Sequence, residues 1–116
     1  MMHGPNDLDL EAMRAAAARA CSLLKTLGNA DRLLLLCQLS QGEFCVSELA
    51  SLLGIPQPTL SQQLGVLRGE NLVETRRKGK QIHYRLASKE AMAVMQVLYQ
   101  LYCAKPQGAS DDDRLA

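Results

Sequence analysis

The feature that most constrains this chain is a short helix, a glycine turn and a second helix that follow one another directly. Apolar residues recur at helical spacing over residues 46–53, and Gly54-Ile55-Pro56 predicts a tight turn that ends this helix. Pro58 fits the first turn of the next helix, which we expect over residues 57–68. Two helices joined by a short turn that contains glycine predict a helix-turn-helix.

The remaining periodicity predicts a mainly helical domain with one β-hairpin. Three more helices are expected, over residues 8–27, 29–39 and 88–103. Asn29 and Ser88 are suitable N-caps for the second and the last of these. Alternating apolar and polar residues predict two strands around Lys78-Gly79-Lys80, over residues 72–77 and 81–86. The expected order is therefore four helices, two strands and a final helix.

The composition fits one folded domain in the cytoplasm. Apolar residues make up 47% of the 116 residues, and only four are Phe or Tyr, so aliphatic side chains must fill the core. We expect the domain over residues 8–103, with polar, flexible tails over 1–7 and 104–116. The longest apolar run, Leu33–Cys37, is far shorter than the roughly 20 residues of a membrane span, and no secretory signal pattern is recognisable. We therefore expect reduced thiols and no membrane partner.

Positive charge gathers directly after the predicted helix-turn-helix. The whole chain has a net charge of +1, but residues 57–85 contain six basic and two acidic side chains, a net charge of +4, which leaves −3 for the rest. Four of these cations surround the expected hairpin turn. Basic residues beside a helix-turn-helix are typical of a protein that contacts DNA phosphates, although a merely solvated turn has a similar composition.

Short polar side chains on the second helix of the motif suit a DNA major groove. Gln62 and Gln63 can pair with adenine edges, and Thr59 and Ser61 can reach phosphates or bases. An adapter of the same fold that binds protein instead of DNA is the alternative. The expected DNA-binding residues are Gln57, Thr59, Ser61, Gln62, Gln63, Arg68, Arg76, Arg77, Lys78 and Lys80.

Over about residues 10–103 the sequence resembles the ArsR-type winged-helix repressors. The resemblance rests on four segments: Asn29-Ala30-Asp31-Arg32, Val46-Ser47-Glu48-Leu49-Ala50, Gln57-Pro58-Thr59-Leu60-Ser61-Gln62-Gln63-Leu64, and Leu72-Val73 before the basic hairpin. It implies a winged helix-turn-helix fold and a homodimer, built on the first and last helices, that binds palindromic operator DNA. The wide apolar faces of these two helices are compatible with a two-fold interface; a monomer whose last helix closes its own core is the alternative.

Within that family, residues 57–67 and the placing of Cys37 and Cys103 look most like the biofilm growth-associated repressors, which sense sulfide-derived persulfides. This resemblance assigns the two thiols to one sensor site. A thiolate that accepts sulfur from a persulfide becomes a persulfide itself, and its partner can convert this to a disulfide or a longer sulfur bridge. The expected inducer is a reactive sulfur species, and a metal ion or a general oxidant such as peroxide is the alternative.

The chain departs from the metal-sensing relatives, which use a Cys-x-Cys pair at the start of the third helix, or Asp, His and Glu on the last one. It has Cys45-Val46-Ser47 at the first place, and no His or Asp over residues 88–103. We therefore expect no metal site and no cofactor. No Cys-x-x-Cys and no glycine-rich phosphate loop occurs, so an enzyme is not expected either.

Cys45 is the thiol for which the residues themselves indicate a separate role. Cys45-Val46-Ser47-Glu48 has the spacing of a capping box, with a cysteine at the N-cap. Backbone N–H groups and the helix dipole make a thiol at a helix N-terminus more reactive, although the charge of Glu48 opposes this. We expect Cys45 to be an accessory reactive thiol and Cys21 to be inert.

Overall fold

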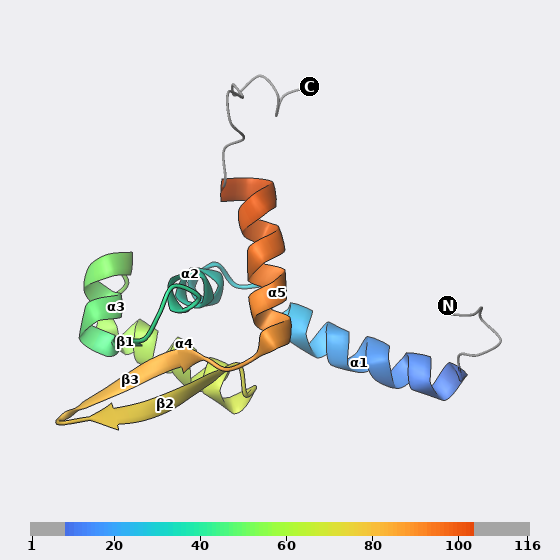
Figure 1. Cartoon of the computed structure of the whole chain (residues 1–116), viewed down its shortest axis with the longest axis horizontal. Coiled ribbons are helices and arrows are strands. Elements are labelled where there is room, and N and C mark those ends of the chain that lie inside the picture. The colour runs from blue at the N-terminus through green and yellow to red at the C-terminus, as the bar shows by residue number, and fades with distance from the viewer. Residues whose placement is uncertain (1–8, 104–116) are drawn as a thin grey trace, which may run out of the picture.

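The computed structural model describes residues 9–103. Its elements in chain order are α1 (Leu10–Leu27), α2 (Ala30–Leu39), β1 (Phe44–Cys45), α3 (Val46–Leu53), α4 (Gln57–Gly69), β2 (Val73–Lys78), β3 (Gln81–Leu86), α5 (Lys89–Leu98) and a π-helical turn, η2 (Tyr99–Cys103). Helices α2–α4 and the sheet form a body from which α1 and α5 extend in different directions (Figure 1). No helix within this range is long and apolar enough to cross a membrane. Leu8, the expected first helical residue, and the expected tails 1–7 and 104–116 lie outside the described residues.

Capping side chains and a glycine turn set the helix boundaries. The Asn29 Oδ1 atom accepts a hydrogen bond from the N–H of Arg32 at 3.0 Å, and Ser88 Oγ accepts one from the N–H of Ala91 at 3.0 Å. Gly54 ends α3 with a φ of 68°, a left-handed conformation that glycine adopts without steric penalty. The two predicted caps and the predicted bounds of α3 are confirmed.

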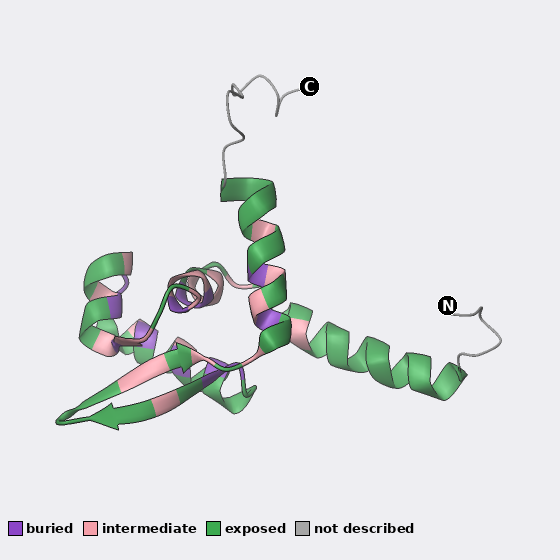
Figure 2. Ribbon diagram, in the orientation of Figure 1, coloured by how far each residue is buried: buried purple, intermediate pink, exposed green. Residues whose placement is uncertain are grey.

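Leucines from α2, α3 and α4 form the core beneath the helix-turn-helix. Six leucine side chains are fully buried: Leu35, Leu36, Leu49, Leu60, Leu64 and Leu67. The three from α4 are spaced four and three residues apart, so one face of this helix packs inward and the opposite face stays exposed (Figure 2). Ala91 and Met95 extend the core to α5. An aliphatic core is what the scarcity of aromatic residues predicts.

The predicted hairpin is present and belongs to a three-stranded antiparallel sheet. Strands β2 and β3 pair from Val73 opposite Leu86 to Lys78 opposite Gln81, and Gly79 takes a φ of 63° in the turn. The other edge of β3 pairs with β1, where Phe44 lies opposite Tyr84. Strand β1 was not predicted, because two residues are too few to show an alternating pattern. Strand β1 connects the start of α3 to the hairpin. We call the hairpin formed by β2 and β3 the wing.

Helices α1 and α5 leave apolar faces uncovered. Of the 18 residues of α1, only Thr26 and Leu27, at its C-terminal end, are buried. The last helix differs from the prediction, since its α-helical part stops at Leu98 and residues Tyr99–Cys103 continue as a π-helical turn. The large apolar side chains exposed on these elements are Leu10, Met13, Leu24, Val97, Tyr99, Leu101 and Tyr102. Apolar side chains exposed repeatedly along a helix are typical of a protein interface.

Candidate DNA interface and thiol cavity

Helix α4 has a polar outer face on the side opposite its buried leucines. Of its predicted DNA contacts, Gln57, Ser61, Gln62 and Arg68 are exposed, and Thr59 is half-buried. A Cβ atom added at Gly65 would meet no atom of another part of residues 9–103 within 4 Å, so the described part of the chain leaves this face open at its centre. A helix with short side chains and a glycine on its outer face can enter a major groove closely. The geometry of α4 is therefore that of a recognition helix.

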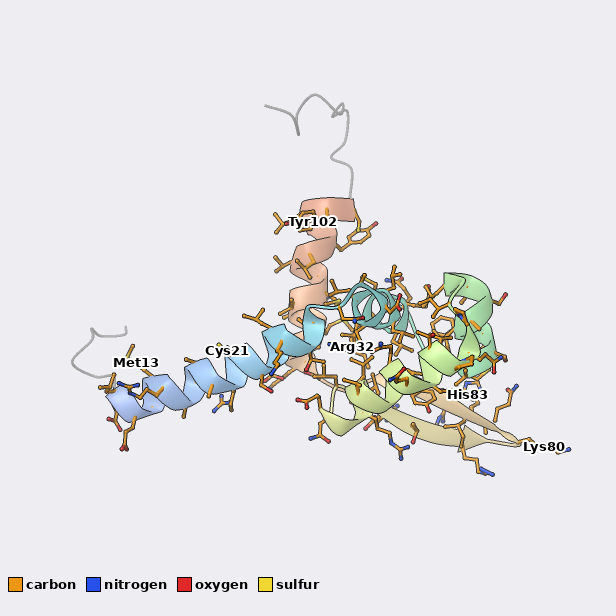
Figure 3. All side chains as sticks on the ribbon, turned by 180° about the vertical axis from the view of Figure 1, so that it is seen from behind. Met13, Cys21, Arg32, Lys80, His83 and Tyr102 are labelled. Atoms are coloured by element: carbon orange, nitrogen blue, oxygen red, sulfur yellow. The ribbon has the colours of Figure 1, made fainter. Side chains whose placement is uncertain are left out.

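Gln63, another predicted DNA contact, also has a partner within the protein. Its Oε1 atom accepts a hydrogen bond from Arg32 Nη1 at 2.9 Å, and Arg32 Nε donates to the carbonyl oxygen of Thr26 at 2.6 Å. Arg32 lies where α1, α2 and α4 meet (Figure 3). Reading an adenine edge needs both the oxygen and the nitrogen of a glutamine amide. The bond to Arg32 occupies one of the two lone pairs of this oxygen and connects α4 to α2, while the role of Gln63 in base recognition stays a prediction.

Arg32 makes contacts between helices that sequence reasoning missed. It belongs to the segment Asn29–Arg32 that supported the family resemblance, but no local pattern indicates its partners. Thr26 precedes it by six residues and Gln63 follows it by 31. Both contacts depend on how α1 and α4 pack against α2, which periodicity does not reveal.

Two of the six cations near the wing are paired with carboxylates. Arg76 Nη2 lies 2.7 Å from Glu43 Oε1, and Arg85 pairs with Glu74. The hydrogen bond from Arg76 lowers the pKa of the Glu43 carboxyl, and Glu43 in turn raises the pKa of Arg76. Glu43 lies 33 residues before Arg76 and outside the segment whose charge was counted. The charge of Arg76, a predicted phosphate contact, is therefore partly balanced within the protein.

The other predicted basic contacts are exposed and belong to no ion pair within residues 9–103. Arg77, Lys78 and Lys80 lie at the turn end of the wing, with Lys80 at its tip, and Arg68 lies in the last turn of α4 (Figure 3). Exposed lysine and arginine side chains can neutralise phosphates without first breaking a contact. These four residues are the basic side chains best placed to hold DNA.

Cys37 and Cys103 line the same cavity, of about 440 Å³, between α2 and the end of α5. Cys37 is half-buried, with its sulfur 4.0 Å from Met95 Sδ, whereas Cys103 is exposed. Burial raises the pKa of the Cys37 thiol, and the nearby Cys103 sulfur raises it further. The other residues that line this space, which we call the thiol cavity, are Ala30, Leu33, Leu34, Leu98, Tyr99 and Tyr102.

The other two cysteines do not line this cavity. Cys45 is only 4% exposed, and its N–H donates a 2.8 Å hydrogen bond to Glu48 Oε1, which lowers the pKa of Glu48. Cys21 is exposed on α1 (Figure 3). A reagent in water reaches an exposed thiol more easily, so exposure favours reaction at Cys21 over Cys45, and the accessory role of Cys45 stays a prediction.

An exposed recognition helix, the leucine core that supports it and a basic wing together define a winged helix-turn-helix DNA-binding protein. Residues 29–75 match the family described as bacterial regulatory protein, arsR family. The chain is 52% identical to the biofilm growth-associated repressor of Agrobacterium fabrum, over 84% of each chain. It therefore belongs to the ArsR family of bacterial regulatory proteins, which confirms the resemblance of the sequence.

Solved structures agree with this assignment. The transcriptional repressor BigR from Xylella fastidiosa is 50% identical to this chain, with a TM-score of 0.76 over 84% of this chain and 100% of that one. A homodimeric winged helix-turn-helix DNA-binding domain, Mb0332 from Mycobacterium bovis, is 30% identical, with a TM-score of 0.68 over 77% and 82%. The protein is a DNA-binding transcriptional repressor and not an enzyme.

Replacing Arg77 and Lys78 together with alanine is expected to weaken binding to every DNA sequence. The slope of log affinity against log salt concentration should become shallower by about two for each DNA-bound protomer, since each lost phosphate contact removes about one. Fluorescence anisotropy with a selected operator and a scrambled duplex, at several salt concentrations, measures both effects. Arg76→Ala is the matched control, and it should change the slope less than Arg77→Ala because Glu43 balances its charge. If Arg76→Ala and Arg77→Ala change the slope equally, the ion pair with Glu43 does not reduce the contribution of Arg76 to DNA binding.

Arg32→Ala and Gln63→Ala are expected to weaken operator binding through the same contact. Each should lower the free energy of unfolding by about 1–3 kcal/mol, and the double variant should lose less than the two single losses together. Urea unfolding and operator affinity are measured for all four proteins of this cycle. If Gln63 reads a base instead, its alanine variant will lose discrimination at one operator position, and its effect will add to that of Arg32→Ala.

Proposed function

We propose that the protein is a homodimeric repressor that leaves palindromic operator DNA when reactive sulfur species oxidise Cys37 and Cys103 to a disulfide or a longer sulfur bridge. The observation that supports this best is the thiol cavity, where residues from two distant segments bring both sulfurs to one space. A repressor of this kind acts where bacterial DNA is, in the cytoplasm.

Helix α2 gives the thiol cavity a physical connection to the recognition helix. Cys37 directly follows Leu35 and Leu36, which are fully buried in the same core as Leu64 of α4. Close-packed side chains transmit a displacement because they have little empty space in which to absorb it. A sulfur bridge that changes the spacing of α2 and α5 would therefore move α4. A loss of only ~1–3 kcal/mol in operator binding corresponds to roughly tenfold or more in affinity.

The uncovered faces of α1 and α5 support the homodimer. Leu24 on α1 is 60% exposed and Tyr102 in η2 is 80% exposed. A two-fold interface would cover such faces and place two recognition helices about 34 Å apart, the spacing of successive major grooves. The Mycobacterium bovis domain with the same fold is homodimeric.

A general oxidant and a metal ion are the two alternative inducers. Peroxide can also join two thiols, through a sulfenic acid, so a general oxidant would act on the same pair. A metal ion would need several ligands together. Within residues 9–103, no group of three His, Cys, Asp or Glu side chains is placed to hold one.

The variant Cys37→Ser/Cys103→Ser is expected to bind operator DNA like the reduced protein and to stay bound when a persulfide donor is added. The unmodified protein should lose about tenfold or more in affinity under the same conditions. Anisotropy measures the affinity, and intact mass identifies the product, since a bridge with one additional sulfur adds about 30 Da to the dithiol. Parallel samples with peroxide and with Zn(II) test the two alternatives.

Cys21→Ser is the matched control for this experiment, because it removes an exposed thiol that lies outside the cavity and should leave the response intact. Release of the double serine variant by the persulfide donor would contradict the proposed switch.

Leu24→Glu is expected to shift the protein from dimer to monomer, because it places a charge on the apolar face of α1 that the interface would bury. Sedimentation velocity over a range of concentrations measures the change. Leu52→Glu is the control, since Leu52 on α3 is similarly exposed, at 57%, but lies outside α1 and α5. Sedimentation of the unmodified protein as a monomer at all concentrations would refute the dimer.

A further inference from the structure

Gly65 is a glycine in the interior of α4 that the fold itself does not require. Glycine destabilises a helix relative to alanine, because it loses more backbone freedom on folding. Such a residue is needed where the backbone takes a positive φ or where another part of the chain comes too close for a Cβ atom. Gly65 has no positive φ, and a Cβ atom added there would meet no atom of another part of residues 9–103 within 4 Å. The fold should therefore accept alanine at this position.

The surface around Gly65 consists of side chains from which DNA contacts are expected. Residues three and four apart are neighbours on a helix surface, so Gly65 lies between Ser61 and Gln62 towards the start of α4 and Arg68 towards its end. These three side chains are exposed, and the buried leucines of α4 occupy the opposite face (Figure 2). The position without a side chain is thus at the centre of the predicted contact surface.

We infer that Gly65 sets the distance between α4 and the base edges, and that its missing side chain is a determinant of specific operator binding. The short side chain of Ser61 and the amide of Gln62 reach base edges only when the helix backbone lies close to them. A methyl group at position 65 would meet the DNA first and hold the whole helix away. This inference rests on operator binding, one part of the proposed function, and does not involve the thiols.

A side chain at position 65 should affect operator DNA more than other DNA. Hydrogen bonds to base edges require donor and acceptor about 2.7–3.2 Å apart, so a displacement of the helix by about 1 Å breaks them. Phosphate contacts depend on long, flexible side chains, such as those of Lys78 and Lys80 on the wing, which can follow such a displacement. Phosphate contacts supply most of the affinity for non-specific DNA. The ratio of the two affinities therefore reports on Gly65.

The test compares Gly65→Ala and Gly65→Leu with the unmodified full chain. Alanine and leucine are both strong helix formers, so both variants should unfold at the same or a higher urea concentration. We expect operator affinity to fall at least about tenfold with alanine and further with leucine, the loss of about one base contact or more. Affinity for a scrambled duplex should change less than about threefold. Fluorescence anisotropy measures both, with an operator selected from random duplexes by the unmodified protein.

Gly69→Ala is the matched control. Gly69 is the last residue of α4, is exposed, and has equally open surroundings. Recognition helices contact base edges mainly with their N-terminal residues, so an alanine one turn further along should change operator affinity less than about threefold. Arg77→Ala is the opposite control, since the loss of a phosphate contact should weaken binding to both duplexes alike.

The outcomes separate this inference from the proposed function. Unchanged operator affinity of Gly65→Ala, or an equal loss for the operator and the scrambled duplex, would overturn the role of Gly65 and leave operator binding intact. A lower urea midpoint for Gly65→Ala would also overturn it, because the fold would then require the glycine. If the unmodified protein prefers no selected duplex over scrambled DNA, both the inference and the proposed repressor are wrong. Should Gly65→Leu fail to fold, Gly65→Ala alone decides the question.

Discussion

The leucine core beneath the helix-turn-helix is the constraint on which the remaining structure depends. Helix α4 buries Leu60, Leu64 and Leu67 in this core, so Ser61 and Gln62 lie on its exposed face, where DNA can be reached. The same core buries Leu35 and Leu36 of α2, directly before Cys37 in the chain. The outer face of α4 and the thiol cavity therefore both adjoin one cluster of buried leucines, and close packing resists independent displacement of the helices that share it.

Polar contacts within the protein decide which side chains remain available to DNA. Arg76 is paired with Glu43, and the side-chain oxygen of Gln63 is bonded to Arg32. Both contacts hold parts of the DNA-binding surface in place: the first joins the wing to the segment before β1, and the second joins α4 to α1 and α2. Side chains of the same chemical type on the DNA-binding surface thus fall into two groups. Some are bonded within the protein, and others are exposed and free to contact DNA.

The surroundings of the two thiols determine their chemical character as much as their proximity does. Cys37 lies against Met95, and burial raises the pKa of its thiol, which disfavours the thiolate relative to a thiol in water. A thiol held mainly in its neutral form reacts slowly with oxidants in general, because the thiolate is the nucleophile. Cys103, exposed at the end of the π-helical turn, opens the same cavity to solvent. The two thiols of this cavity therefore differ in their surroundings, since Cys37 is half-buried and Cys103 is exposed.

The sequence by itself determined the features that depend on near neighbours in the chain. The bounds of α3, the caps Asn29 and Ser88 and the paired strands of the wing follow from residues within one or two turns, and the structure has all of them. Only the tertiary structure decided strand β1, the burial of Cys45, the pairing of Arg76 with Glu43 and the role of Arg32. Each of these requires segments far apart in sequence to pack together, and periodicity and local propensity report only whether a segment can form a helix or a strand, not which distant side chain it will meet.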